Sequence, residues 1–166
     1  MEHIAELLMS AGSLEKLKVA ILYGADAVYM GTPDLSLRTR SNFSLDDVLE
    51  GVAFAHAHGK RAYLALNLFS HNRDIEKLPE YIQTIRKVGP DGIIVADPGV
   101  FNYVKQAAPE LELHISTQAN VCSWLSAQFW GELGAKLIVL LPVEAKREVA
   151  APARFAALDI GVEADA

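Results

Sequence analysis

Short apolar runs alternate along the chain with segments in which apolar residues recur every three or four positions. The apolar runs occupy residues 6–9, 27–30, 62–66, 92–96, 111–115 and 137–140. Their length and near-continuous apolar character are typical of buried parallel strands. Between them, helical periodicity and capping residues predict helices that begin after Ser13, Ser44, Asp97 and Ser123 and near Pro79. The pattern predicts repeated strand–helix units.

A glycine followed by one or two polar residues returns each helix to the next strand. The signal occurs at Gly24-Ala25-Asp26, Gly59-Lys60, Gly89-Pro90-Asp91 and Gly134-Ala135-Lys136. Such returns make successive strands parallel. About six strand–helix units fit the spacing of a (β/α)8 barrel, whose full length is ~250 residues. We therefore expect an α/β fold, an incomplete TIM-like barrel with parallel strands.

The main structural alternative is a doubly wound parallel sheet. A dinucleotide-binding version is disfavoured, because the first strand–helix turn holds only Gly12 and lacks the glycine fingerprint of that class. Near the end of the chain, a short helix is expected over residues 143–149, and residues 158–162 have the composition to begin a seventh strand. We interpret residues 1–166 as a single truncated barrel domain with a tail over residues 150–166.

Composition narrows the class of protein. Hydrophobic residues make up 51% of the chain and charged residues 22%, as in globular domains. The formal charge of −6 disfavours unaided binding to nucleic acid, and the candidates for a local basic patch are Arg38 with Arg40 and Lys60 with Arg61. The single cysteine, Cys122, excludes an intramolecular disulfide and a cysteine-only metal site within one copy. The first residues do not resemble a signal peptide and no apolar run approaches the ~18 residues that span a bilayer, so we expect a cytoplasmic protein without a membrane partner.

Polar side chains gather where the predicted strands end. In parallel sheets and barrels the carboxyl ends of the strands share one edge, where ligands bind. The densest group is His114-Ile115-Ser116-Thr117-Gln118-Ala119-Asn120, which ends a strand and precedes a helix. The convergence predicts a ligand site at this edge, whereas the alternative for each loop is that it merely caps its own helix. Candidate substrate-binding residues are Arg38, Asn67, His71, Asn72, Asp97, Ser116, Gln118 and Asn120.

The candidates differ in chemistry. Arg38 suits an anion, because a guanidinium binds carboxylate or phosphate through two hydrogen bonds; the alternative is a surface arginine. His71 and Asp97 are the candidates for acid–base catalysis, although an exposed loop histidine and a helix cap describe them as well. His114 is interpreted as a hydrogen-bonded residue of the barrel wall. We assign no catalytic residue and no metal ligand, and Cys122 has no neighbouring base that would make it a nucleophile.

The motifs as a set resemble peptidase family U32, the collagenase-like proteases, over about residues 5–149. The resemblance is carried by Ala11-Gly12-Ser13, Gly24-Ala25-Asp26-Ala27-Val28-Tyr29, Ser36-Leu37-Arg38, Asn67 with His71-Asn72, Ala96-Asp97-Pro98-Gly99 and Ser116-Thr117-Gln118-Ala119-Asn120. It is nearest to the subgroup implicated in prephenate-dependent hydroxylation of a tRNA uridine; other relatives act on ribosomal RNA or in ubiquinone hydroxylation. Met9-Ser10 departs from the Ala-Pro usual in the family.

The resemblance implies a TIM-like barrel followed by a cysteine-bearing segment that holds an iron–sulfur cluster. A cluster needs about four thiolates, and Cys122 does not match a ligand position, so we expect no cofactor in this chain and a cluster only in a full-length member. The implied function is the N-terminal barrel portion of a tRNA uridine hydroxylation protein, with tRNA or a small prephenate-like acid as partner. The alternatives are a genuine peptidase, or an inactive fragment that only binds or self-associates through uncovered barrel edges.

Overall fold

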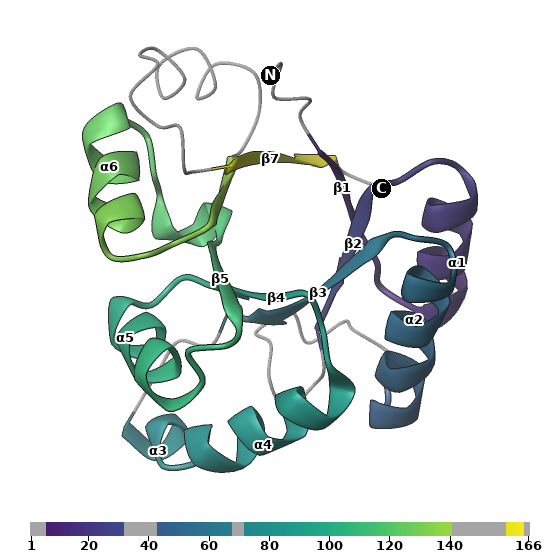
Figure 1. The fold of residues 1–166 in the computed structure, drawn as a ribbon, viewed down its shortest axis with the longest axis horizontal. Helices are drawn as coiled ribbons and strands as arrows, with labels where there is room; N and C mark the ends of the chain where they lie inside the picture. The colour runs from purple at the N-terminus through teal and green to yellow at the C-terminus, as the bar shows by residue number, and fades with distance from the viewer. Residues whose placement is uncertain (1–5, 32–42, 68–71, 141–158, 165–166) are drawn as a thin grey trace.

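Seven parallel strands form a closed barrel in the computed structural model, which describes residues 6–31, 43–67 and 72–140 and the backbone of residues 159–164. The strands are β1 (Leu7–Ser10), β2 (Ala27–Met30), β3 (Arg61–Leu66), β4 (Gly92–Val95), β5 (Glu112–Ile115), β6 (Leu137–Leu140) and β7 (Asp159–Ala164). Each pairs with its neighbours in chain order, and β7 pairs with β1 (Figure 1). The predicted TIM-like arrangement of parallel strands is confirmed, and the doubly wound sheet is wrong.

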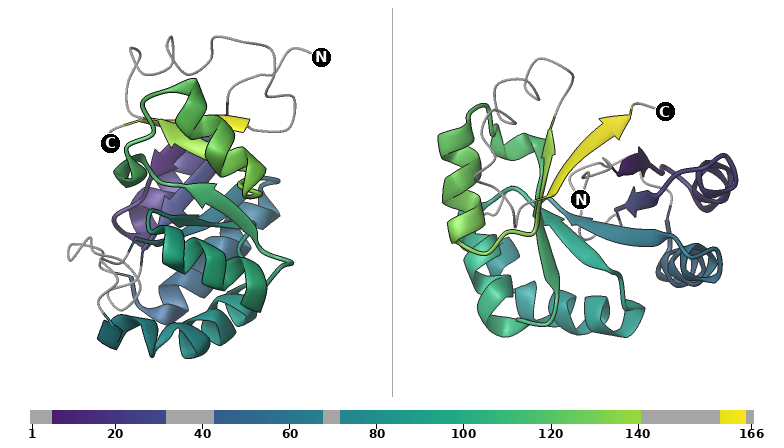
Figure 2. Two further views of the ribbon diagram at one scale, coloured as in Figure 1. Left: turned by 90° about the vertical axis from the view of Figure 1, so that its left-hand side faces the viewer. Right: turned by 45° about the horizontal axis from the view of Figure 1, so that its top comes forward.

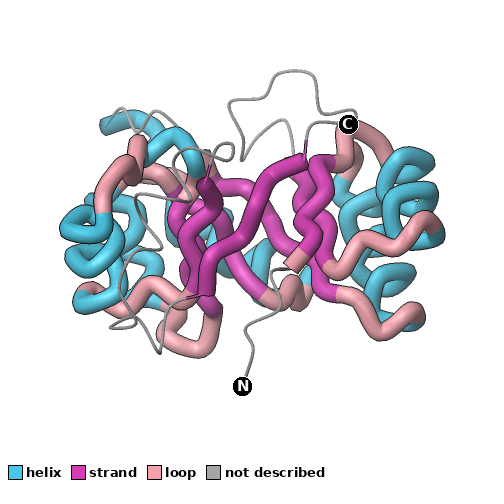
Figure 3. Tube along the Cα trace, turned by 90° about the horizontal axis from the view of Figure 1, so that it is seen from above, coloured by secondary structure: helices cyan, strands magenta, loops and turns pink. Residues whose placement is uncertain are grey.

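The helices lie outside the ring of strands (Figures 1 and 3). They are α1 (Leu14–Leu22), α2 (Leu45–Ala57), α3 (Asn72–Ile75), α4 (Leu78–Val88), α5 (Pro98–Ala107) and α6 (Trp124–Glu132), with a 3-10 turn, η1 (Thr117–Ala119), after β5. Ser13, Ser44, Asp97 and Ser123 each accept a hydrogen bond from a backbone N–H in the first turn of their helix. The capping residues therefore fix the helix starts that the sequence predicts.

The apolar stripe of α2, which comprises Leu45, Val48, Leu49 and Val52, is only partly buried. Leu45 and Leu49 are 49% and 40% exposed, whereas Val48 and Val52 are buried together with Gly51 and Ala55. Small residues let this helix approach its neighbour closely, since a Cβ built at Gly51 would lie 3.0 Å from Leu17 Cδ1 of α1. The buried face of α2 therefore includes Gly51, which lies against α1, and excludes Leu45 and Leu49.

The end of the chain closes the ring. The possible strand at residues 158–162 is present as β7, where Leu7 pairs with Val162 and Leu140 also pairs with Val162 on the other side. Every strand in the described part of the chain therefore has a partner along both edges. The predicted helix at 143–149 lies outside the described residues, and Figure 2 shows no described helix over the outer face of β7.

Two cores result from this closure. The larger lies between the strands and the surrounding helices. The smaller fills the barrel and contains Leu8, Ala27, Tyr29, Tyr63, Ala65, Ile94, Leu137 and Val139. Polar atoms lie at both ends of this inner core, and Tyr63 belongs to the core through its ring. We call Glu6, Arg61, Tyr63 and His114, at the N-terminal ends of the strands, the N-terminal polar group, and Asn67 with Ser116, just beyond β3 and β5, the C-terminal polar pair.

Candidate substrate-binding site

A recess lies at the C-terminal ends of the strands, where ligands bind in parallel barrels. Its enclosed volume is about 10 Å³, room for one water-sized group, and the recess opens outward to solvent. It is lined by Tyr29, Asn67, Ile94, Ser116, Thr117, Gln118 and Val139. The apolar side chains and the tyrosine come from the barrel interior, and the other polar ones follow β3 and β5. The recess thus combines an apolar wall with uncharged hydrogen-bonding groups.

The C-terminal polar pair bridges the recess. Asn67 Nδ2 donates to Ser116 Oγ over 3.2 Å, and both residues are buried, at 8% and 4% exposure. The strands β3 and β5 are not adjacent, because β4 lies between them. Leu66 pairs with Val95, and Val95 with Ile115, so Asn67, Ala96 and Ser116 follow at one level. At this level the residue of the intervening strand is Ala96, whose side chain is a single methyl group.

The loop after β5 holds Ser116 in place. Ser116 Oγ also accepts from the backbone N–H of Gln118 at 3.3 Å, which starts η1. The turn ends at Asn120, whose φ of 53° is left-handed, a conformation that asparagine tolerates better than most residues. Cys122 Sγ donates to Asn120 Oδ1 at 3.2 Å. A serine-led turn with a left-handed asparagine therefore directs Ser116 into the barrel while the chain turns outward to α6.

One polar atom of the recess has no partner. Asn67 Oδ1 is buried, and no hydrogen-bond partner for it lies in the described part of the protein. A buried amide oxygen left without a hydrogen bond costs about 1–3 kcal/mol. Unpaired buried groups are rare in proteins, and here the group lies in the wall of a recess.

The structure brings together only some of the predicted site residues. Asn67, Ser116 and Gln118 line the recess. Asp97 caps α5, where Oδ1 accepts from Val100 N at 2.8 Å, and Asn72 begins α3 outside the lining. Asn120 ends η1 and likewise does not line the recess. Arg38 and His71 lie outside the described residues.

Tyr29, Ile94 and Val139 were missing from the predicted site. Each lies in an apolar strand, where sequence alone does not tell the inside of the barrel from the helix-facing side. One signal in the sequence could have identified them. Side chains of a strand alternate between its two faces, so Tyr63, Ala65 and Asn67 lie on the same face, which is the barrel interior. Applying the same alternation to the neighbouring strands β2 and β4, in their register with β3, would have placed Tyr29 and Ile94 on the interior face.

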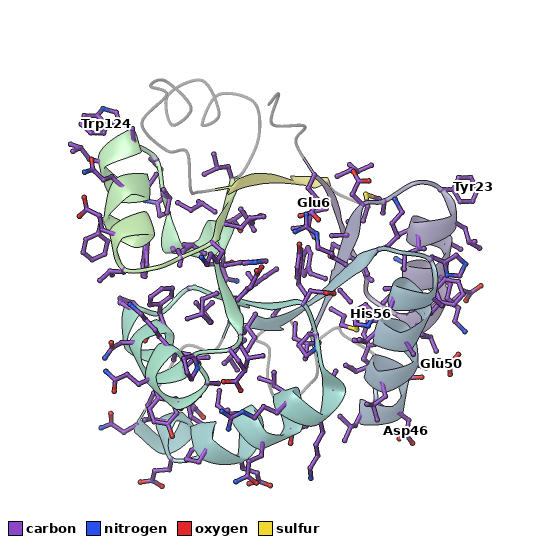
Figure 4. The ribbon with its side chains drawn as sticks, in the orientation of Figure 1. Glu6, Tyr23, Asp46, Glu50, His56 and Trp124 are labelled. Atoms are coloured by element: carbon purple, nitrogen blue, oxygen red, sulfur yellow. The ribbon has the colours of Figure 1, made fainter. Side chains whose placement is uncertain are left out.

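The N-terminal polar group lies at the opposite end and is largely paired within itself. Tyr63 Oη donates to both carboxylate oxygens of Glu6 at 3.1 and 3.0 Å, and Arg61 Nη2 forms an ion pair with Glu6 at 2.6 Å. Figure 4 shows Glu6 inside the ring of strands. Burial raises the pKa of Glu6 against the opposing effects of Arg61 and Tyr63. Burial and the nearby Glu6 raise the pKa of Tyr63 above its ordinary value, so its hydroxyl keeps its proton and donates.

His114 departs from the expected hydrogen-bonded wall residue. It is 1% exposed, and its Nδ1 has no partner among the described residues. The ring meets Tyr63 edge-on with centroids 4.5 Å apart, and Nε2 lies 3.6 Å from Glu112 Oε2. Burial, assisted by the charge of Arg61, lowers the pKa of His114 to about 4. The imidazole is therefore neutral at pH 7 and packs as an aromatic ring.

The described residues do not form a metal or cluster site. No group of three or more histidine, cysteine, aspartate or glutamate side chains in this part of the chain is arranged to hold a metal ion. Cys122 is exposed and is the single cysteine of the sequence. The four thiolates of an iron–sulfur cluster are therefore not available within one copy of this chain. Within the same residues, no helix is long and apolar enough to cross a membrane.

A ring of parallel strands surrounded by helices, with a recess at the strand C-termini, is a TIM-like α/β barrel. The chain belongs to peptidase family U32, whose model matches residues 12–152. It is 42% identical over 136 residues to tRNA hydroxylation protein P1 of Bacillus subtilis and 45% identical over 136 residues to tRNA hydroxylation protein P of Helicobacter pylori. Each alignment covers 81% of this chain and 32% of the relative, so the chain spans about a third of their length.

A solved structure supports the fold. The U32 peptidase Mk0906 superposes with a TM-score of 0.76 at 18% identity, over 96% of this chain and 68% of that one. At this identity the similarity establishes the fold alone. The family resemblance and the TIM-like architecture expected from the sequence are both confirmed.

Proposed function

We propose that this chain is the substrate-binding barrel portion of an RNA hydroxylation protein that acts on a tRNA uridine. The observation that carries the proposal is the recess at the strand C-termini, which offers uncharged hydrogen-bonding groups beside apolar wall residues. A nucleobase presents the same combination, an apolar face and a polar edge. The similarity to tRNA hydroxylation proteins supports this choice of substrate.

The oxidation itself requires groups beyond the described residues. We propose that an iron–sulfur cluster, which the family resemblance implies, is bound by other residues of a full-length protein, because one cysteine is too few for it. When bound, such a cluster supplies electron transfer. The role of this chain is then to bind and orient the base. We also propose a cytoplasmic location, where tRNA modification takes place.

Two partner interactions belong to the same proposal. A small prephenate-like acid is the proposed second substrate, and Arg38, outside the described residues, is the candidate ligand for its carboxylates.

Self-association also stays a proposal. Because the barrel is closed, free strand edges no longer explain why copies of the chain would associate. An apolar groove along β1 and α1 offers another surface, since Leu7, Val19 and Tyr23 in its wall are 44%, 48% and 88% exposed. Figure 4 shows Tyr23 on the outer side of α1. Light scattering that finds a monomer at all concentrations would contradict self-association.

The family name favours peptide hydrolysis as the second candidate. A serine peptidase needs a base within hydrogen-bond reach of its nucleophile. Ser116 Oγ is bonded to Asn67 Nδ2 and Gln118 N, and the buried His114 has no bond through Nδ1. The geometry of the described residues therefore supports binding more than hydrolysis.

Complementation tests the proposed function. The full-length protein that carries this chain is expressed in a strain whose own tRNA hydroxylation gene is deleted, and hydroxylated uridine in its tRNA is measured by mass spectrometry. We expect modification to return, while the purified protein leaves gelatin uncut. Restored modification with no peptide cleavage supports the hydroxylation assignment. Gelatin cleavage that a Ser116→Ala substitution abolishes, in a strain whose tRNA stays unmodified, would establish the peptidase instead.

A further inference from the structure

The C-terminal polar pair is the feature of the molecule with the clearest unused binding capacity. Asn67 is 8% exposed, and its Oδ1 has no partner in the described residues. Its Nδ2 is already engaged by Ser116 Oγ. The side chain is thus held at one end and offers its other end to the recess that it lines.

The hydrogen-bond inventory of the pair defines what it accepts. Ser116 Oγ receives hydrogen bonds from Asn67 Nδ2 and Gln118 N, which occupies both of its lone pairs and leaves its hydroxyl proton to donate. The recess therefore presents an acceptor, Asn67 Oδ1, beside a donor, Ser116 O–H. A 180° rotation of the amide exchanges donor and acceptor at Asn67, but the atom facing the recess stays uncharged and unpaired.

The recess is also electrically neutral. Of the described residues that line it, Tyr29 alone carries an ionisable group, and none is a lysine or an arginine. A carboxylate that entered would lose hydration and would meet the acceptor Asn67 Oδ1, with no cation among the described lining residues to offset the cost. A neutral ligand with an adjacent N–H and C=O, such as an imide or amide, would donate to Asn67 Oδ1 and accept from the Ser116 hydroxyl without that cost.

We propose that Asn67 and Ser116 together determine the specificity of the recess, and that they bind the uncharged N–H/C=O edge of a pyrimidine base rather than a carboxylate of a small acid. The inference rests on the proposed function for the presence of RNA, but the residue assignment comes from the geometry. It separates the two substrates in space, because the acid must then bind at other residues.

Direct binding tests the assignment independently of turnover. The probes are a short uridine-containing RNA hairpin, the same hairpin with N3-methyluridine at the target position, and prephenate, each titrated against the full-length protein. The variant Asn67→Asp keeps the shape of the side chain and adds a charge, and Asn102→Asp on α5 makes the same chemical change at an exposed residue bonded to Gln106. Ser116→Ala removes the partner hydroxyl.

We expect Asn67→Asp to weaken hairpin binding by about tenfold or more, the effect of one well-formed base contact, and Ser116→Ala to weaken it by a few-fold. The Asn67 and Ser116 variants should bind prephenate as the wild type does, and Asn102→Asp should bind the hairpin as the wild type does. Methylation of N3 should weaken hairpin binding to the wild type. The methylated hairpin should lose little further affinity when Asn67 is changed to Asp, because both changes remove the same contact.

Several results would overturn the assignment. These are unchanged hairpin binding in both Asn67→Asp and Ser116→Ala, a loss that is equal for methylated and unmethylated hairpins, or a loss confined to prephenate. Thermal melting shows whether Asn67→Asp is folded, and Ser116→Ala carries the test if it is not. Binding that depends on Asn67 without restored hydroxylation would refute the proposed function while retaining this contact.

Discussion

The two ends of the barrel interior hold polar groups of different kinds. The N-terminal polar group contains charges that satisfy one another, since Glu6 meets both Tyr63 and Arg61. Each end leaves one buried atom without a partner among the described residues, His114 Nδ1 and Asn67 Oδ1, but the C-terminal polar pair contains no charge and lies in the wall of a recess. Buried charges are tolerated when paired, whereas the unpaired acceptor at the recess costs about 1–3 kcal/mol that a bound ligand could recover. We infer that the N-terminal end serves stability and the C-terminal end serves recognition.

The largest expected effect comes from Tyr63→Ala at the N-terminal end. The substitution removes a fully buried ring and both hydrogen bonds to Glu6, and we expect a loss of about 3–5 kcal/mol in the free energy of unfolding. Urea denaturation measures it. Tyr63→Phe, which removes only the hydroxyl, should cost about 1–3 kcal/mol, and Tyr23→Ala on the surface should change little. Equal stability of Tyr63→Ala and the wild type would refute the structural role.

The second prediction concerns acid. Between the ordinary pKa of histidine, 6.5, and the folded value of about 4, the unfolded chain binds a proton at His114 and the folded chain does not. Lowering the pH through this window therefore favours unfolding, by on the order of 3 kcal/mol at its acid end. The raised pKa of Glu6 acts in the opposite direction, and the lowered pKa of Asp26 adds to the loss.

The contribution of His114 is isolated by comparing the wild type with His114→Leu. Urea denaturation at several pH values between 7 and 4 should show a smaller loss for the variant, because it keeps the other titrating groups and removes this one. Parallel curves for the two proteins would show that His114 is not buried as a neutral ring.

A third effect, of about 1–3 kcal/mol, is expected for Gly92→Ala. A Cβ at Gly92 would lie 2.8 Å from His114 Cε1, so the buried ring must shift. Gly12→Ala is the matched control, because a Cβ there meets no atom within 4 Å. Thermal melting of both variants measures the difference, and a loss of the same size at Gly12 would contradict close packing around His114.

The smallest effect on stability is expected for Ser116→Ala at the C-terminal end. The substitution removes hydrogen bonds from Asn67 Nδ2 and Gln118 N, each worth about 0.5–1.5 kcal/mol in net terms. A destabilisation of more than ~3 kcal/mol in urea would erase the contrast between the two ends. Unchanged stability combined with weakened RNA binding would sharpen it.

The sequence predicts the elements closely because their signals are local. Ser13, Ser44, Asp97 and Ser123 cap helices as expected, and the left-handed glycines at 24, 59, 89 and 134 end them. Ser116 and Gln118 were predicted near a site from the polar loop alone. Tyr29 was not, because its strand is apolar throughout, and only the closed ring distinguishes its inner from its outer face.

By itself the sequence determined the strand–helix repeat, the parallel strands and the polar character of the strand exits, since periodicity, caps and glycine turns act within a few residues. Tertiary structure alone decided that β7 closes on β1, that Asn67 reaches Ser116 across β4, and that Glu6, Tyr63 and His114 share the opposite end. These contacts join residues far apart in the chain. Their geometry depends on barrel register and closure, which no local pattern encodes.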